Sequence, residues 1–275
     1  LRPLHRALRG WERRRPVVKR PPLVRPLAVA MAMRLVVWGH PAMAVALLLA
    51  FHCYLRIGEL LRVEARDYVP ASPRGLGNSH SFLHIPKAKT GAQQDVIITD
   101  PEVAWLLALA VRAAHVLQPM TAPGFVRVFP YGERVFRSLF AQCAASYGIP
   151  RQIVPHSMRH GGATHDFVSG ARSADEVRIR GRWRMEKSMQ HYVGAMRSAL
   201  ATLHVPERAM WCGAALADDR ITAFRGLLAL APATPEVRAF RSALVSLDGT
   251  GGPGGGESAL GHWAVSYTHL RAHET

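Results

Sequence analysis

Cysteine is scarce in this chain of 275 residues: only Cys53, Cys143 and Cys212 are present. Their number is odd and no two of them are spaced as C-x-x-C. This argues against a disulfide framework and against a thiolate zinc site. The cysteine usage therefore favours a reducing compartment.

Acidic residues are few relative to basic ones. The chain has 19 Asp and Glu against 35 Lys and Arg, and its formal net charge is +16 at pH 7. Such an excess predicts an anionic partner, of which a nucleic acid backbone is the commonest. Charge alone selects no activity, because an RNA-binding or ribosome-associated protein would share it.

The sequence also lacks a long uninterrupted apolar run. Residues 27–55 are the most apolar stretch, but Arg34, His40 and Pro41 interrupt it and leave segments of core-helix length. We therefore expect neither a membrane span nor a signal peptide. A hydrophobic fraction of 49% is sufficient for one sizeable core.

Composition divides the chain into three parts. Residues 1–26 are crowded with Arg, Lys and Pro and are predicted to be an extended basic arm, which is either a solvated linker or a nucleic-acid contact. Residues 27–210 are predicted to form the main domain. Residues 211–275 are predicted to be a C-terminal extension, partly a disordered linker, GTGGPGGGES, and ending in an artefactual tail, SYTHLRAHET, that resembles a translated sequencing adapter. Because the chain opens on Leu1, we expect it to be a fragment.

Helical signals dominate the pattern. Pro41 begins an apolar run typical of a buried helix, and Asp100-Pro101 resembles a helix start. Further helices are predicted over residues 132–147, after Pro155, over 173–180 and over 186–203.

Two β-prone runs, residues 82–85 and 95–99, flank a Lys, Gly and Gln stretch that suits a hairpin turn. Lys87 and Lys89 are therefore expected near the hairpin tip. Together with the helices, the hairpin predicts a mainly α fold with a small antiparallel β-sheet (α+β).

Short motifs that contain polar and aromatic residues follow one another along the chain. Each is ordinary alone, because R-x-x-E-L is typical of an amphipathic helix, a hairpin lysine is usually solvated, and Trp or Tyr usually packs in a core. They are RIGEL with Arg56 and Glu59, KAKT with Lys89, HSMRH with His156, Arg159 and His160, GRW with Trp183, and finally Tyr192.

Taken together and in this order, with Tyr192 nine residues after Trp183, the motifs resemble the catalytic domain of the tyrosine recombinase (phage integrase) family. The resemblance extends over roughly residues 22–205. It implies the catalytic-core fold of DNA breaking-rejoining enzymes, and an enzyme that cleaves and rejoins DNA strands through a 3′-phosphotyrosine formed by Tyr192.

The implied chemistry explains the residue types. Attack on a phosphodiester builds up negative charge on the nonbridging oxygens, and an enzyme without a metal must meet it with fixed cations. Arg56 and Arg159 suit this role because planar guanidinium groups bind phosphate oxygens bidentately and stay charged. Trp183 would add an indole N–H donor.

Proton transfer requires further groups. By the resemblance, His156 accepts the proton of Tyr192, and Lys89 protonates the leaving 5′ oxygen, with Lys87 as the alternative if the register differs by two. Glu59 is expected to hold Arg56 in register, and His160 is a further supporting residue.

The resemblance also implies partners. We expect double-stranded DNA, a homotetramer on DNA, no cofactor, no metal and no membrane. The location would be intracellular, with DNA, in a nucleus or in a bacterial cytoplasm or nucleoid, and the gene would belong to a mobile element. The expected DNA-binding residues outside the catalytic set are Arg13, Arg14, Arg15, Lys19, Arg20 and Lys87.

Other interpretations stay open. The chain departs from the family at Gly161 and Gly162, which are expected to loosen the helix that carries Arg159. A catalytically decayed DNA-binding relative and a type IB topoisomerase-like enzyme are the alternatives. A zinc hydrolase built on His156, His160 and His165 would lack a suitably placed carboxylate base.

Overall fold

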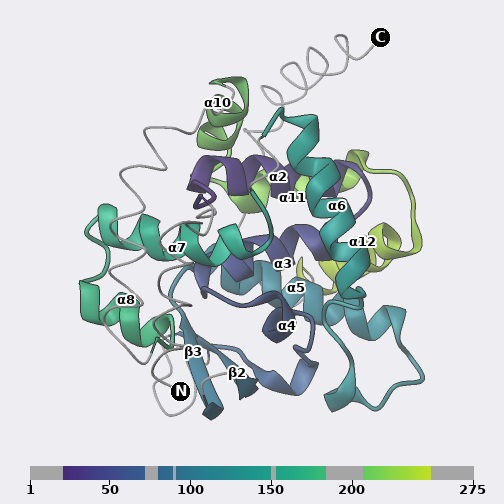
Figure 1. The fold of residues 1–275 in the computed structure, drawn as a ribbon. Helices are drawn as coiled ribbons and strands as arrows, with labels where there is room; N and C mark the ends of the chain where they lie inside the picture. The colour runs from purple at the N-terminus through teal and green to yellow at the C-terminus, as the bar shows by residue number, and fades with distance from the viewer. Residues whose placement is uncertain (1–20, 72–79, 89–90, 150–152, 184–206, 249–275) are drawn as a thin grey trace, which may run out of the picture.

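The computed structural model describes residues 21–71, 80–88, 91–149, 153–183 and 207–248 (Figure 1). Helices predominate in this part of the chain, and a small antiparallel sheet lies at one edge. This confirms the predicted fold class. The helices longer than one turn are α2 (Arg25–Val37), α3 (Pro41–His52), α5 (Pro101–Leu117), α6 (Glu133–Ser146), α7 (His156–Val168), α8 (Ala174–Arg180), α10 (Glu207–Ala215), α11 (Arg220–Leu230) and α12 (Pro235–Asp248).

Helices α2 and α3 form the centre of the core. Almost every residue of α3 is buried, as expected for a helix that is apolar on all sides. Pro41 stands in the first turn of α3, and Gly39, with φ of 85°, makes the bend that separates α3 from α2. Among the described helices, none combines the length and the apolar character needed to cross a bilayer.

The predicted hairpin is present. Strands β2 (Ser81–Ala88) and β3 (Gly91–Ile98) pair antiparallel, with Leu83 opposite Val96, and β1 (Tyr68–Val69) adds to the outer side of β2. The side chains of Leu83 and Val96 are buried, so one face of the hairpin packs on the helices. The sheet is therefore held against the helices by one of its faces.

The N-terminal part of the fold begins before the predicted domain start at residue 27. Leu23 is fully buried, and its backbone N–H donates to the carbonyl of Ser157 at 2.9 Å. Arg25 already belongs to α2. The predicted arm is therefore too long at its C-terminal end by several residues, because the apolar Leu23 was hidden among prolines and cations. Residues 1–20 lie outside the described part.

The predicted division at residue 210 is also not seen. Helix α10 runs across it, and Phe224 of α11 and Phe240 of α12 are buried in the same core as α2 and α3. Polar contacts fix the extension as well, because the Arg220 Nε donates to Glu102 at 2.7 Å and the Tyr131 hydroxyl donates to Glu236. The extension up to residue 248 is thus part of the domain.

Gly161 and Gly162 do not interrupt α7. Instead they allow α7 to lie directly against the backbone of its neighbours: a Cβ on Gly161 would stand 1.9 Å from the Leu23 carbonyl oxygen, and one on Gly162 would stand 1.8 Å from that of Phe51. The expected loosening of the helix is wrong, because the close packing outweighs the low helix propensity of glycine. This contact sets the distance between α7 and the end of α3.

Replacement of Gly162 by Ala should therefore destabilise the protein strongly. Overpacking typically costs about 1–3 kcal/mol, and a clash with a backbone carbonyl belongs at the upper end or above it. Urea unfolding followed by circular dichroism measures the change. Gly132→Ala is the matched control, because nothing lies within 4 Å of its added Cβ; an equal destabilisation of the two variants would contradict the packing account.

Candidate active site

Arg56 and Glu59 lie at the start of α4 (Ile57–Leu60), just after the turn that follows α3. The Arg56 Nη1 donates to Glu59 Oε1 at 2.6 Å, and the Arg56 backbone N–H donates to Oε2 at 2.9 Å. The ion pair expected from the i, i+3 spacing is therefore present. The side chain of Arg56 is 24% exposed and that of Glu59 only 2%, so the arginine is the member of the pair that faces solvent.

Arg159 extends from α7 into the protein and is only 1% exposed. Its two terminal nitrogens donate to the backbone carbonyls of Tyr54 and Gly181. Tyr54 lies two residues before Arg56, so this contact brings the two predicted phosphate-binding arginines to the same turn. A guanidinium group held by two carbonyls keeps its charge and cannot rotate away.

Trp183 packs against Arg159. The Arg159 guanidinium carbon lies 4.7 Å from the centroid of the Trp183 ring, within the range of a cation–π contact. The Trp183 ring also stacks with that of Tyr54, with centroids 6.3 Å apart. Tyr54, Trp183, Ala163 of α7 and Val177 of α8 make a small apolar cluster separate from the main core.

His156 and His160 share the first turns of α7 with Arg159. His156 is exposed, and the two imidazole rings meet edge to face with centroids 4.5 Å apart. Because His156 precedes Arg159 by one helical turn, both residues lie on the same side of α7. His156 is thus an exposed residue one helical turn from the buried arginine.

Arg182, which none of the sequence motifs singled out, completes the cluster. Its Nη2 donates to Glu59 Oε2 at 2.7 Å, so Glu59 lies between two guanidinium groups. Burial alone would raise the pKa of Glu59, but the charge of Arg182 and the hydrogen bonds from Arg56 hold it below its usual value. The carboxylate is therefore ionised at neutral pH.

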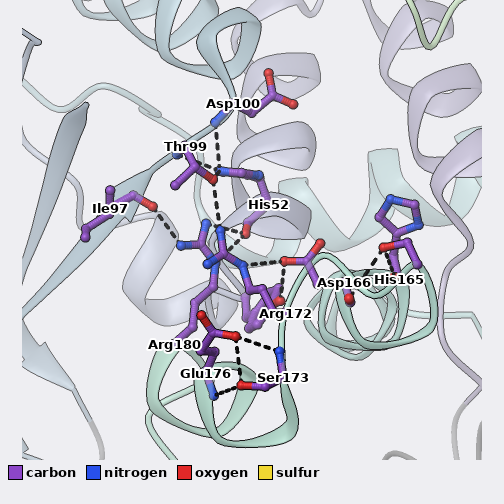
Figure 2. A network of polar contacts seen from close by, with 12 residues as sticks. His52, Ile97, Thr99, Asp100, His165, Asp166, Arg172, Ser173, Glu176 and Arg180 are labelled. Carbon is purple, nitrogen blue, oxygen red and sulfur yellow. Dashed lines mark hydrogen bonds and ion pairs between the residues drawn. The ribbon is translucent and has the colours of Figure 1, made fainter. Parts of the chain in front are cut away.

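A second network joins this cluster to the base of the hairpin (Figure 2). Arg180 of α8 donates to the carbonyl of His52 at the end of α3 and to that of Ile97 in β3, at 2.8 and 2.7 Å. Arg172 donates to Asp166 of α7 and to the hydroxyl of Thr99, both at 2.9 Å. Two arginines thus connect the end of β3 to three helices.

His52 is a partly buried acceptor in this network. Its Nε2 accepts from the backbone N–H of Thr99 at 3.2 Å. Burial, followed by the charge of Arg180, lowers the pKa of His52 to about 3. The imidazole is therefore neutral at physiological pH and acts as an acceptor, which suits a position surrounded by arginines.

Tyr54 also belongs to the second network. Its hydroxyl donates to Asp166 Oδ2 at 2.5 Å, and burial together with that carboxylate raises its pKa. Tyr54 therefore stays protonated. Its carbonyl accepts from Arg159 and its hydroxyl donates to Asp166. Tyr54 therefore connects the arginine cluster to the network of Figure 2.

The described residues thus bring Arg56, Glu59, Arg159 and Trp183 together, with His156 beside them. Of these residues, Arg159 and Trp183 are buried. Tyr192, Lys89 and the arm residues Arg13, Arg14, Arg15, Lys19 and Arg20 lie outside the described part. Lys87 belongs to β2, and its side chain is outside it too.

The part of the chain in view contains no group of three or more His, Cys, Asp or Glu side chains arranged to hold a metal ion. His156, His160 and His165, the set considered for a zinc hydrolase, therefore do not form such a group.

Comparison with known proteins gives similarity in fold. No protein-family model and no curated sequence matches this chain.

Among solved structures, the crystal structure of XerA recombinase is similar with a TM-score of 0.49 and 16% identity, covering 68% of this chain and 63% of that one. The chain therefore spans under two thirds of that recombinase. The Tn1549 transposon integrase, solved in complex with transposon right end DNA, is similar with a TM-score of 0.45 and 14% identity, covering 75% of this chain and 68% of that one.

Glu59 should give folding a measurable pH dependence. Because its pKa in the folded protein is below the ordinary value of 4.5, the stability that it contributes is complete above that value. It is lost as the pH falls through the lower, folded-state pKa. The difference in unfolding free energy between wild type and Glu59→Gln should therefore be large at pH 7 and shrink below pH 4.5.

Urea titrations at pH 7, 5, 4 and 3 would measure this difference. Glu133→Gln is the control, because Glu133 forms an exposed i, i+4 pair with Arg137 on α6, and such pairs contribute little. A Glu59→Gln difference that is constant over this pH range would show that the carboxylate is not ionised between the arginines.

Proposed function

We propose that this chain is a DNA strand-transfer enzyme of the tyrosine recombinase type, in which Tyr192 attacks a phosphate held by Arg56 and Arg159. The observation that carries the proposal is the convergence of three guanidinium groups on one turn. Arg159 and Arg182 both donate to the Tyr54 carbonyl, and Arg56 and Arg182 share Glu59. The resemblance of the motifs assigns roles to the same residues.

Electrostatics favours an anion at this place. Arg56, Arg182 and Glu59 sum to a charge of +1, and Arg159, whose terminal nitrogens donate to the carbonyls of Tyr54 and Gly181, lies beside them. Cations withdrawn from water are costly unless an anion compensates them. A phosphodiester supplies one negative charge and develops more as it is attacked, so the cluster is better matched to the transition state than to the bound substrate.

The proposed sequence of steps follows from the residue types. Tyr192 loses its proton to His156 and attacks phosphorus, and the 5′ oxygen leaves with a proton from Lys89. The product is a 3′-phosphotyrosine, which conserves the energy of the phosphodiester. Attack by the 5′ hydroxyl of another strand then releases Tyr192 and restores the DNA backbone.

The hairpin network fits this scheme. Arg180 and Arg172 hold the base of β3 at Ile97 and Thr99, while Lys89 follows β2 at the other end of the hairpin. In this proposal, the contacts of the hairpin base with α3, α7 and α8 limit the region over which the hairpin can move. In this proposal the hairpin delivers Lys89 to a phosphate bound at Arg56.

A nicked suicide substrate tests the chemistry. Wild type, incubated without Mg²⁺ or ATP with nicked duplexes that carry the DNA flanking its gene, should form a covalent protein–DNA adduct visible after denaturing electrophoresis. Tyr192→Phe keeps the ring but lacks the attacking oxygen, so it should bind the same DNA and give no adduct. Wild type that binds DNA but forms no adduct would instead support a catalytically decayed binding protein.

Arg56→Ala should slow adduct formation by about 10²–10³-fold, the usual effect of removing one donor to a transition-state oxyanion. The fold should survive, because Arg56 is partly exposed. Arg137→Ala, which removes an exposed arginine of α6, is the matched control and should react like wild type. A normal rate for Arg56→Ala would remove this arginine from the proposed site.

DNA binding should weaken steeply with salt, because the chain has a formal charge of +16. Deletion of residues 1–20, which leaves the buried Leu23 in place, should reduce the slope of log K against log salt by about 0.9 for each phosphate that the arm neutralises. Truncation after Asp248 removes a single arginine, Arg271, and serves as the control. An unchanged slope after the first deletion would show that the arm neutralises no phosphate.

A further inference from the structure

Arg182 has an unusual backbone conformation. Its φ is 56°, in the left-handed region that long side chains rarely adopt, and Tyr54, with φ of 50°, is the other described non-glycine residue with positive φ. Such conformations are strained and persist where the surroundings require them. The two residues meet, because Arg182 Nη2 lies 3.4 Å from the Tyr54 carbonyl oxygen.

The contacts of Arg182 show what this conformation achieves. The side chain turns inward and is only 5% exposed, and its Nη2 donates to Glu59 Oε2 at 2.7 Å. The Nη1 donates to the carbonyl of Arg180 at 3.3 Å. Its Nε is buried without a hydrogen-bond partner in the described part of the chain. The contact between this guanidinium and Glu59 is therefore formed despite a strained backbone and an unsatisfied N–H.

The shared carboxylate determines how Arg56 is held. A carboxylate has two oxygens and readily takes one arginine bidentately. Here Oε2 accepts from Arg182 and from the backbone N–H of Arg56, and the side chain of Arg56 donates to Oε1. Without Arg182, Glu59 and Arg56 would sum to zero charge; with it, the three groups keep a charge of +1.

We propose that Arg182 is a positioning residue for Arg56. Arg182 binds one oxygen of Glu59 and offsets its negative charge, so that the positive charge of Arg56 is not cancelled and part of its guanidinium group is directed toward a phosphate. The inference rests on the proposed function, because it assigns a phosphate to Arg56. Arg182 itself acts through Glu59 and does not contact the phosphate.

Arg182→Gly is the informative variant. Glycine adopts a φ of 56° without steric cost, so the substitution removes the guanidinium and relieves the backbone at the same time. The protein should stay folded, with a melting temperature near that of wild type. The single-turnover rate of adduct formation at saturating DNA should fall at least tenfold, while the DNA concentration for half-maximal rate changes little. Arg182→Lys, which keeps a charge near Glu59, should recover part of the rate.

A double-mutant cycle separates positioning from direct phosphate contact and from a general structural effect. In an Arg56→Ala background, Arg182→Gly should slow the reaction little further, because the residue through which it acts is absent. The same fold reduction in rate in both backgrounds would overturn the proposal, as would a reduction that follows the melting temperature across the Gly and Lys variants.

A measurement without catalysis distinguishes this inference from the proposed function. Titration of the protein with inorganic phosphate should shift the guanidinium NMR signal of Arg56 in wild type, and the shift should be absent in Arg182→Gly. If wild type forms no adduct but shows this difference, the proposed catalysis fails and the positioning role stands. If phosphate does not affect Arg56 in wild type, or affects both proteins equally, the inference is wrong.

Discussion

The hydrogen bonds from Arg159 to the carbonyls of Tyr54 and Gly181 are the interaction on which the site depends. They join three segments that are distant in sequence: helix α7, the turn after α3 and the end of α8. The turn carries Arg56, and the end of α8 leads into Arg182 and Trp183. A buried guanidinium requires its partners in fixed places, because leaving its donors unsatisfied is costly. Arg159 is thus both a predicted catalytic group and the element that assembles the others.

This arrangement requires close packing of α7. Gly161 and Gly162 bring the helix into contact with the carbonyls of Leu23 and Phe51, and Arg159, two residues earlier, then reaches the turn after α3. The left-handed Tyr54 directs its carbonyl toward Arg159 while its hydroxyl contacts Asp166. Packing, backbone conformation and charge therefore act together: the core fixes the distance between helices, and that distance fixes the cations.

The sequence predicted the parts of the fold that follow from local pattern. Asp100 accepts from the backbone N–H groups of Glu102 and Val103 as a helix start should, and the hairpin pairs the predicted strands. It did not predict α11 and α12 as part of the core, because their buried residues are interleaved with small and polar ones and meet α2, α3 and α5 only in three dimensions. The role of Gly161 and Gly162 was missed for the same reason, since propensity describes a helix alone and not its neighbour.

Within the site, the pair of Arg56 and Glu59 was readable from spacing, whereas Arg182 was not. An arginine in the middle of GRW looks like one more surface cation in a basic chain; only its positive φ and its burial against Glu59 distinguish it. The central claim is that Arg56 and Arg159 hold a DNA phosphate. The most direct measurement is an experimental structure of the Tyr192→Phe variant with a nicked duplex. The account predicts a backbone phosphate within hydrogen-bonding distance of Arg56, on the side of α7 that carries His156; a duplex bound elsewhere, with no phosphate at Arg56, would contradict it.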